Sequence, residues 1–281
     1  MNSNLFDKCI DLSISEDIGD GDHSSLCCLN PKRMGVAKLT AKDNGVIAGI
    51  EVAEKVFAKL DSSLKFTPLL KDGDTIEPGK LIFTVEGSEI SILSAERLVL
   101  NIMQRMSGIA TQTRKYVEAV KGTKTKILDT RKTTPGFRIF EKEAVKIGGG
   151  TNHRFGLFDM IMLKDNHIDF AGGIEKAIDS AISYLKENNK NLKIEVETRS
   201  IDDVRRVLNH GGVDRVMLDN FTPEQTIEAV KLINGAVEVE SSGGITIETI
   251  RDYAECGVDF ISVGALTHQV KSLDMSLTVE L

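Results

Sequence analysis

From Lys126 onward the sequence alternates between short apolar runs and helical stretches, and this alternation restricts the possible folds more than any other feature. The candidate strands lie at 126–129, 158–163, 192–197, 214–218, 236–240 and 259–263, and the helical stretches lie near 138–147, 172–187, 201–210, 223–233 and 246–255. Apolar strands joined by helices indicate a parallel sheet. Six or seven such units in about 145 residues predict a parallel α/β barrel with fewer than the usual eight strands.

The first part of the chain has a different pattern and predicts a small α+β domain. We expect helices over 4–18 and 50–60, strands over 36–42 and 45–50, and hairpins over 65–86 with turns at 71–74 and 77–79. A longer helix is expected over 94–120, with Ser94 as its N-cap. Gly108 lies inside that helix and predicts close packing against a neighbour, since glycine otherwise weakens a helix.

Cations gather in one part of an otherwise acidic chain. Residues 97–167 hold fourteen Lys or Arg against six Asp or Glu, a net charge of +8, while the remainder holds twenty-one against thirty-six, a net charge of −15. Such an inversion favours a site for a small ligand with several negative charges. No nucleic acid is expected as a partner, because the rest of the surface would repel it. A set of solvated basic helix faces is the alternative explanation.

The remaining composition points to a cytoplasmic protein. No run approaches the ~18 apolar residues that a membrane span needs, so no membrane contact is expected. The first 22 residues lack the basic and apolar regions of a signal peptide. The cysteines Cys9, Cys27, Cys28 and Cys256 show no zinc-ligand spacing, and we therefore expect free thiols.

Polar or glycine-rich segments follow the predicted strands of the barrel. These segments are 129–132, 164–167, 197–199, 219–220, 240–244 and 264–267. In parallel barrels the carboxyl ends of the strands form the active-site face. The last two segments are rich in glycine, and barrels commonly bind a phosphate at that position with backbone N–H groups. Ser242, Gly243 and Gly244 fit this function.

Several basic side chains are expected to converge on the same face. They are Arg131, Lys132, Arg138, His153, Arg154 and Lys164. Arginine binds carboxylates and phosphates through two parallel hydrogen bonds, so we predict a ligand, or a pair of ligands, with several negative charges. Glu197 and Asp219 face these cations. Carboxylates in such a setting hold Mg²⁺ or ribose hydroxyls, or stabilise positive charge at a sugar C1; simple ion pairing with the arginines is the alternative.

Long motifs throughout the chain resemble the quinolinate phosphoribosyltransferase family. They are DTRKTTPGFR, GGGTNHRFGLFDMIMLKDNHI, VMLDNF, ESSGGIT, VGALTH, EDIGDGDHSS, AERLVLNIMQRMSGIATQT and LDMSLTVEL. The resemblance implies an N-terminal α+β open sandwich over 1–106, joined by the tail 268–281, and an incomplete α/β barrel over 107–267. It also implies a homodimer, or a hexamer built from dimers, in which the neighbouring subunit completes each active site.

The resemblance further implies a reaction of de novo NAD biosynthesis. Quinolinate and phosphoribosyl pyrophosphate would give nicotinate mononucleotide, pyrophosphate and CO₂, with Mg²⁺ as the cofactor. The residues that would hold the quinolinate carboxylates are Arg131, His153, Arg154 and Lys164. Arg97 would reach into the partner's site. Thr130 and Lys132 would contact substrate, with Lys132 near the pyrophosphate and ribose.

The remaining implied residues concern the sugar and its 5′-phosphate. Glu197 and Asp219 would contact the ribose hydroxyls, with Mg²⁺ or through it, and form the catalytic set together with Lys132. The residues that would cradle the phosphate are Ser242, Gly243, Gly244, Gly264, Ala265 and Leu266. By strand alternation Glu195 points to the same face as Glu197; we choose Glu197 because it lies nearer the carboxyl end. A relative acting on nicotinate, a molybdenum-associated homologue and a non-catalytic phosphosugar-binding barrel remain as alternatives.

Overall fold

The computed structural model describes residues 3–280, which divide into two compact units. The first unit contains the chain up to residue 114, the segment 133–149 and the chain from 265 onward. The second unit contains 115–132 and 150–264. This division differs from the expected one in the segments 107–114, 133–149 and 265–267, which the sequence assigns to the barrel and which here group with the N-terminal unit.

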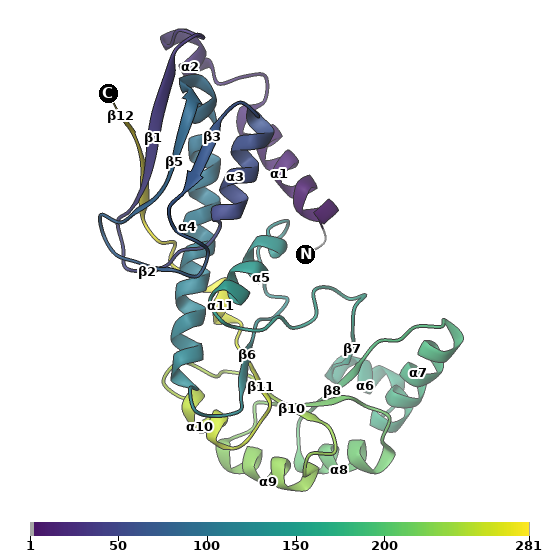
Figure 1. Cartoon of the computed structure of the whole chain (residues 1–281). Coiled ribbons are helices and arrows are strands. Elements are labelled where there is room, and N and C mark those ends of the chain that lie inside the picture. The colour runs from purple at the N-terminus through teal and green to yellow at the C-terminus, as the bar shows by residue number, and fades with distance from the viewer. Residues whose placement is uncertain (1–2, 281) are drawn as a thin grey trace. The chain divides into compact units, whose positions relative to one another are not determined.

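The first unit is built on a four-stranded antiparallel sheet with the order β12-β1-β5-β3 (Figure 1). Its strands are β1 (Met34–Ala41), β3 (Lys65–Pro68), β5 (Leu81–Ser88) and β12 (Met275–Glu280). Two short strands, β2 (Gly45–Val46) and β4 (Thr75–Ile76), pair with each other outside that sheet. The hairpins expected over 65–86 are therefore only partly right, because β3 pairs with β5 and β4 pairs with β2.

The helices of the first unit include two, at 23–28 and 265–268, that were not expected, and one that begins earlier than expected. The helices are α1 (Ser3–Ile18), α2 (His23–Cys28), α3 (Ile50–Leu60), α4 (Glu89–Ala119), α5 (Arg138–Ile147) and α11 (Ala265–His268), with α4 continuing into the second unit. Ser94 is not the N-cap of α4, because the helix already begins at Glu89; the Ser94 hydroxyl instead donates to Asp22 Oδ2 at 3.2 Å. Gly108 is closely packed as predicted, since a Cβ there would overlap the Lys271 carbonyl oxygen.

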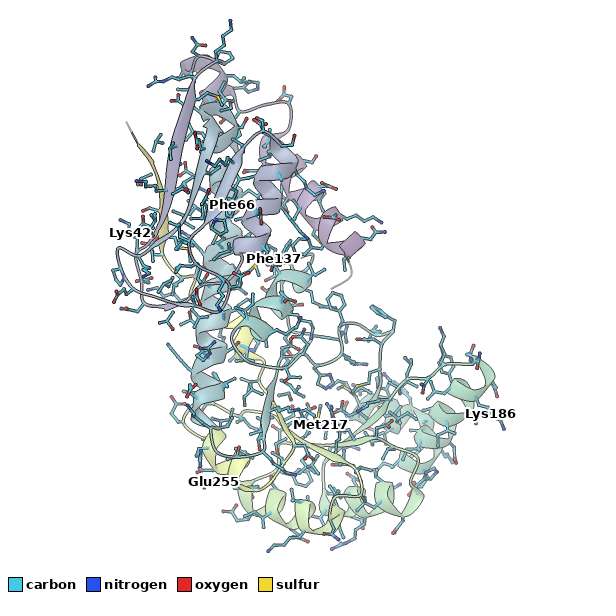
Figure 2. All side chains as sticks on the ribbon, in the orientation of Figure 1. Lys42, Phe66, Phe137, Lys186, Met217 and Glu255 are labelled. Atoms are coloured by element: carbon cyan, nitrogen blue, oxygen red, sulfur yellow. The ribbon has the colours of Figure 1, made fainter. Side chains whose placement is uncertain are left out.

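Aromatic side chains fill the core beneath the antiparallel sheet. The ring of Phe66, labelled in Figure 2, lies 4.6 Å from that of Phe83 and 5.9 Å from that of Phe57, measured between centroids. Phe57 belongs to α3, whose apolar residues recur at helical spacing and are buried. Packing of α3 against the sheet therefore follows from its sequence pattern.

The second unit is a six-stranded, all-parallel sheet with the order β6-β11-β10-β9-β8-β7. Its strands are β6 (Lys126–Leu128), β7 (Ile161–Leu163), β8 (Ile194–Thr198), β9 (Arg215–Asp219), β10 (Glu238–Ser242) and β11 (Phe260–Ser262). All six coincide with predicted strands. Among the described residues β6 and β7 stand at the two edges of the sheet, so the predicted incomplete α/β barrel is confirmed.

Helices connect these strands along the outer side of the sheet (Figure 1). They are α6 (Asp165–Ala171), α7 (Ile174–Glu187), α8 (Ile201–His210), α9 (Pro223–Ile233) and α10 (Ile250–Glu255). The helix α6 was not predicted. Gly172 and Gly173, both with positive φ, separate it from α7, and its polar start was interpreted as the loop after a strand.

The strands of the parallel sheet carry charged residues on one face. All five residues of β8 are buried, including two glutamates that alternate with apolar residues. Arg215 of β9 and Glu240 of β10 are also buried. Because successive side chains of a strand point to opposite faces, the apolar residues of β8 face one side and the glutamates the other. The barrel interior therefore contains charges, whereas barrels are mostly filled with branched apolar side chains.

None of the described helices is both long enough and apolar enough to span a bilayer. The four cysteines are free thiols, as expected.

Candidate active site

Two acidic residues and a serine lie together at the carboxyl ends of the neighbouring strands β8, β9 and β10. Glu197 is the penultimate residue of β8, Asp219 ends β9 and Ser242 ends β10. Asp219 and Ser242 are direct neighbours in the strand register. Burial raises the pKa of Asp219, and the negative charge of Glu197 raises it further. The two carboxylates are therefore close enough to repel each other.

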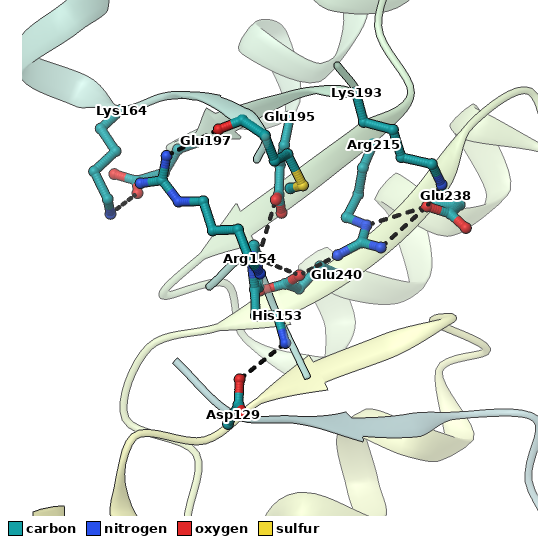
Figure 3. A network of polar contacts seen from close by, with 11 residues as sticks. Asp129, His153, Arg154, Lys164, Lys193, Glu195, Glu197, Arg215, Glu238 and Glu240 are labelled. Carbon is teal, nitrogen blue, oxygen red and sulfur yellow. Dashed lines mark hydrogen bonds and ion pairs between the residues drawn. The ribbon is translucent and has the colours of Figure 1, made fainter. Parts of the chain in front are cut away.

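Lys164 lies over this acidic pair. It immediately follows β7, and its Nζ is 2.8 Å from Oε2 of Glu197 (Figure 3). Its positive charge also opposes the rise in the pKa of Asp219. The Lys164 side chain is 46 % exposed, whereas that of Glu197 is 8 % exposed. Lys164 can therefore contact an anion from solvent while it remains paired with the acid below.

The turn after β10 depends on a glycine. Gly243 has φ +95°, and a Cβ there would overlap the Asn220 side chain and lie 2.9 Å from the Asn220 backbone nitrogen. Asn220 is itself constrained: its backbone N–H donates to the Ser242 carbonyl oxygen at 2.9 Å, and its Nδ2 donates to Asp219 Oδ2 at 2.8 Å. Gly243 therefore allows the turn to pass beside the residue that holds Asp219.

Replacing Gly243 with Ala is expected to lower the free energy of unfolding by about 1–3 kcal/mol, because the new methyl group displaces Asn220 and the backbone is strained at positive φ. Gly244→Ala is the matched control, since Gly244 also has positive φ but a Cβ there meets no atom within 4 Å. Urea denaturation of both variants measures the difference. Equal losses would mean that the contact with Asn220 does not matter.

The segment that carries His153 and Arg154 is fixed to the edge of the sheet. Thr151 forms an isolated parallel bridge with Leu128 of β6. The backbone N–H of His153 donates to Oδ1 of the fully buried Asp129 at 2.8 Å. The backbone N–H of Arg154 donates to the Nδ1 of His153 at 2.7 Å. The sequence folds this way because Asp129 follows β6 directly and can accept from the segment beside it.

Arg154 is partly buried, and it experiences the positive charge of Arg131 as well as the negative charges of Glu195 and Asp159. Its Nη1 donates to the Met160 carbonyl oxygen at 3.2 Å. Burial lowers the pKa of Arg154, and the positive charge of Arg131 lowers it further. Two guanidinium groups that repel each other are stabilised when an anion binds to both, and a carboxylate is the natural match for their geometry. Arg131 and Arg154 therefore form the strongest candidate for an anion site.

A layer of buried charges lies beneath His153 (Figure 3). Its Nε2 is 3.1 Å from Oε2 of Glu195 and 3.3 Å from Oε2 of Glu240. Nη1 of Arg215 is 3.0 Å from the same oxygen of Glu240. Arg215 also pairs with Glu238 at 3.1 Å. Within the described residues these contacts connect β8, β9 and β10 across the interior of the sheet.

The pKa values of this layer follow from burial and pairing. Burial lowers the pKa of His153, but the hydrogen bonds and negative charges of Glu195 and Glu240 outweigh this effect and raise it. Burial raises the pKa of Glu195 to about 7, and the charge of Glu240 adds to the rise. Burial also penalises the charged form of Glu240, yet the contact with His153 prevails and lowers its pKa. Because the Arg154 N–H is directed at Nδ1, these contacts together favour a proton on Nε2 of His153.

The structure places the remaining predicted site residues, but their functions stay predictions. Thr130 Oγ1 accepts from the Lys132 backbone N–H at 3.0 Å, and Arg131 and Lys132 are exposed. Gly264 precedes α11, which begins with Ala265 and Leu266; the Leu266 side chain is fully buried, so only its backbone is available to a phosphate. In the first unit, Arg97 is exposed on α4, and Arg138 Nε donates to Thr133 Oγ1 at 2.8 Å.

Sequence reasoning did not assign a function to Asp129, Arg215 or Glu240. Asp129 and Glu240 were seen only as parts of polar strand ends, and Arg215 was not considered. The available signal was alternation. Charged residues occupy every second position in 193–197 and two of the three alternate positions in 215–219 and in 238–242, where a buried strand would ordinarily carry apolar residues.

Comparison with known proteins identifies the family of the chain. The family described as "Quinolinate phosphoribosyl transferase, C-terminal domain" matches residues 109–278, and the corresponding N-terminal domain matches 22–107. A quinolinate phosphoribosyltransferase [decarboxylating] 1b of Nicotiana tabacum is 46 % identical over 96 % of this chain and 81 % of its own length. A probable nicotinate-nucleotide pyrophosphorylase [carboxylating] of Bacillus subtilis is 41 % identical over 100 % of this chain and 96 % of its own.

A solved structure extends the likeness to three dimensions. The crystal structure of NadC from Streptococcus pyogenes is 40 % identical to this chain, covers 100 % of it and 99 % of its own length, and superposes with a TM-score of 0.92. Both domain families and the whole-length relatives lead to the same conclusion. The chain belongs to the quinolinate phosphoribosyltransferase family.

Proposed function

We propose that this chain transfers the phosphoribosyl group of phosphoribosyl pyrophosphate to quinolinate with loss of CO₂, giving nicotinate mononucleotide and pyrophosphate. One observation carries the proposal beyond family membership. Glu197, Asp219 and Lys164 all lie at the carboxyl ends of the parallel strands. An ion pair of 2.8 Å joins Lys164 to Glu197, and Glu197 acts electrostatically on Asp219. A site for one anion alone would not require two interacting carboxylates.

Quinolinate carries two carboxylates, and the basic side chains provide for both. Arg154 and Arg131 repel each other in the absence of an anion, and the lowered pKa of Arg154 reflects that repulsion after the effect of burial. A quinolinate carboxylate between them would replace repulsion with charge-assisted hydrogen bonds. Lys164, which is half exposed and paired with Glu197, would bind the other carboxylate. Nicotinate, with one carboxylate, would leave one of these cations without a substrate partner.

Phosphoribosyl transfer requires stabilisation of positive charge at C1 of the sugar. When pyrophosphate leaves with the electron pair of the C1–O bond, C1 becomes oxocarbenium-like, and Glu197 and Asp219 would stabilise it electrostatically. The pyridine nitrogen of quinolinate then donates its lone pair to C1. The resulting cationic ring accepts the electron pair of the bond to the 2-carboxylate as CO₂ departs, and that ring carbon finally takes a proton from water.

The same acid pair fits Mg²⁺. This ion prefers carboxylate oxygens and also binds substrate phosphates. Glu197 and Asp219 are neighbouring oxygen donors whose mutual repulsion, seen in the raised pKa of Asp219 after the effect of burial, a cation would relieve. Glu197 and Asp219 would hold the ion, directly or through water or the ribose hydroxyls. Mg²⁺ bound there would neutralise negative charge on the departing pyrophosphate.

Removal of Mg²⁺ with excess EDTA is expected to abolish turnover, and Mg²⁺ added beyond the chelator is expected to restore it. The physical reason is that the charge on pyrophosphate would then lack its counterion. The release of nicotinate mononucleotide measures the effect. Quinolinate binding alone, followed by calorimetry, serves as the control and should survive chelation because its cations belong to the protein. Full turnover in EDTA would contradict a metal requirement.

We further propose a homodimer, alone or within a hexamer, in which Arg97 of one subunit contributes to the site of the other. The support is the family resemblance together with the exposure of Arg97 on α4. Mixing Arg97→Ala with Lys164→Ala, each inactive alone, should restore part of the activity, because some sites then have both wild-type residues. Absence of any recovery despite proven subunit exchange would contradict a shared site.

The decisive test of the activity is chromatography of protein incubated with phosphoribosyl pyrophosphate and Mg²⁺, with either quinolinate or nicotinate. Nicotinate mononucleotide appearing only with quinolinate is the expected result. Formation of product from nicotinate would mean that this chain is a nicotinate-using phosphoribosyltransferase. No product from either substrate would leave a phosphosugar-binding barrel as the better description.

A further inference from the structure

The buried layer under His153 has no part in the mechanism above, although burying charges is costly. The side chains of Glu195 and Glu240 are fully buried, and Arg215 is 8 % exposed. Taking a carboxylate out of water costs several kcal/mol unless good partners compensate, and apolar residues of similar volume often stabilise a core at least as well. Buried charges retained in this way point to a functional constraint.

The arrangement of the layer places two carboxylates on one nitrogen. Glu195 and Glu240 come from β8 and β10, which flank β9 in the sheet, and both approach Nε2 of His153, at 3.1 and 3.3 Å. Arg215 lies on β9 between them and is in register with Glu195. Its guanidinium is held by Glu240, by Glu238 and by the ring of Phe260, 4.1 Å away. The Glu240 carboxylate is therefore itself fixed in position.

His153 is held on three sides. Its backbone N–H is bound by Asp129, its Nδ1 accepts from the backbone N–H of Arg154, and its Nε2 lies against the two carboxylates. The imidazole therefore joins the buried layer to the backbone of Arg154. A rotation of the ring would break the contact at Nδ1 and remove one restraint on Arg154, whose guanidinium would keep, within the described part of the chain, only its bond to the Met160 carbonyl oxygen.

We propose that Glu195 and Glu240, of which Glu240 is held by Arg215, are positioning residues that fix the His153 ring and thereby place Arg154 for quinolinate binding. This inference rests on the proposed function. It assigns Glu195 a different task from Glu197: Glu195 acts through His153 on the pyridine substrate, whereas Glu197 acts at the sugar. Both glutamates of β8 then have a function: Glu197 near the carboxyl end of the strand, and Glu195 deeper in the barrel.

A bound metal ion is the competing explanation for the cluster. The ligand atoms of His153, Glu195 and Glu240 lie within 4.8 Å of one another, which suits a small cation. Against this, Arg215 already donates to Oε2 of Glu240, the oxygen nearest to His153. Metal analysis of the purified protein belongs to the test.

The test compares Glu195→Gln and Glu240→Gln, which keep the shape and remove the charge. Glu238→Gln is the matched control, because Glu238 pairs with the same Arg215 but is 37 % exposed. Calorimetry on the full chain without phosphoribosyl pyrophosphate should show the Kd for quinolinate rising roughly 10- to 100-fold in the two buried variants, because a displaced binding group costs that much, and changing less than about threefold in the control. The KM for phosphoribosyl pyrophosphate should change less than about threefold in all three variants.

A second readout does not depend on activity. In ¹⁵N-histidine-labelled protein, the Nε2–H of His153, assigned with a His153→Gln variant, should give a resolved signal protected from solvent exchange. That protection should be lost in Glu195→Gln and Glu240→Gln and kept in Glu238→Gln. A general loss of stability would lower protection in the control as well.

The outcomes separate the possible explanations. Unchanged quinolinate affinity and an unchanged His153 signal in the folded variants would overturn the proposal. Failure of both Gln variants to fold would also overturn it by assigning the layer to core stability; if only one folds, that variant decides. One equivalent of transition metal present in the parent and missing from Glu240→Gln would replace it with a metal site. If the parent neither binds nor converts quinolinate, the proposed function fails, while the His153 signal still decides the positioning.

Discussion

Replacing Glu197 with Gln is expected to lower kcat roughly 10²- to 10³-fold, the loss typical of removing one preorganised electrostatic group from a transition state. The amide keeps the size of the side chain but cannot stabilise positive charge at C1. The quinolinate KM should change little or fall, because Lys164 loses its 2.8 Å partner and becomes more available to a carboxylate. A fall in kcat without a rise in KM identifies an interaction that is made mainly in the transition state.

Steady-state kinetics with both substrates measure this split. Glu187→Gln, at the exposed end of α7, is the control for loss of one negative charge and should behave as the parent. Full turnover in Glu197→Gln together with a greatly lowered kcat in Glu195→Gln would transfer the catalytic role to Glu195. The two glutamates can thus be assigned independently, since Glu195→Gln is expected to act on quinolinate affinity.

Replacing Arg154 with Ala is expected to raise the quinolinate KM about 100-fold. Two charge-assisted hydrogen bonds would be lost, and a net loss of about 3 kcal/mol corresponds to that factor. The KM for phosphoribosyl pyrophosphate should stay near the parent value. Arg154→Lys should recover only part of the loss, because an ammonium group cannot reproduce the two parallel bonds of a guanidinium.

Calorimetric titration with quinolinate checks this prediction without turnover. Arg205→Ala is the matched control, because Arg205 is a surface residue of α8 whose nearest acid, Glu228, is 3.7 Å away. Truncation of Lys164 should likewise weaken quinolinate more than phosphoribosyl pyrophosphate. Normal quinolinate affinity in both the Arg154 and the Lys164 variants would mean that the substrate assignment is wrong.

The fold was largely predictable because its signals are local. Each strand of the parallel sheet lies where a short apolar run was seen, and α5 covers the predicted residues 138–147. The errors also have local causes. Ser94 was chosen as an N-cap because it precedes a clear apolar stripe, yet the helix extends back to Glu89. The helix α6 is short and polar, so it resembled a loop.

The candidate site was predictable only as a set of strand ends. Parallel strands direct their carboxyl ends to one face, so the proximity of Glu197 and Asp219 followed from the pattern. The contacts of Arg215 did not, because they depend on which strands are neighbours and in which register. The sheet order places β9 between β8 and β10, and this fact makes Glu195, Arg215 and Glu240 one cluster. No short segment of sequence contains that information.

The bridge between Thr151 and β6 has a consequence for solubility. Thr151 donates its N–H to the Ile127 carbonyl oxygen at 2.8 Å, and its own carbonyl oxygen accepts from Asp129 at 3.2 Å. These bonds occupy the side of β6 that faces away from β11. An uncovered edge strand invites pairing with other chains, and aggregation follows. The loop that carries His153 and Arg154 therefore also covers the exposed side of β6. Shortening this loop would be expected to weaken substrate binding and also to promote self-association.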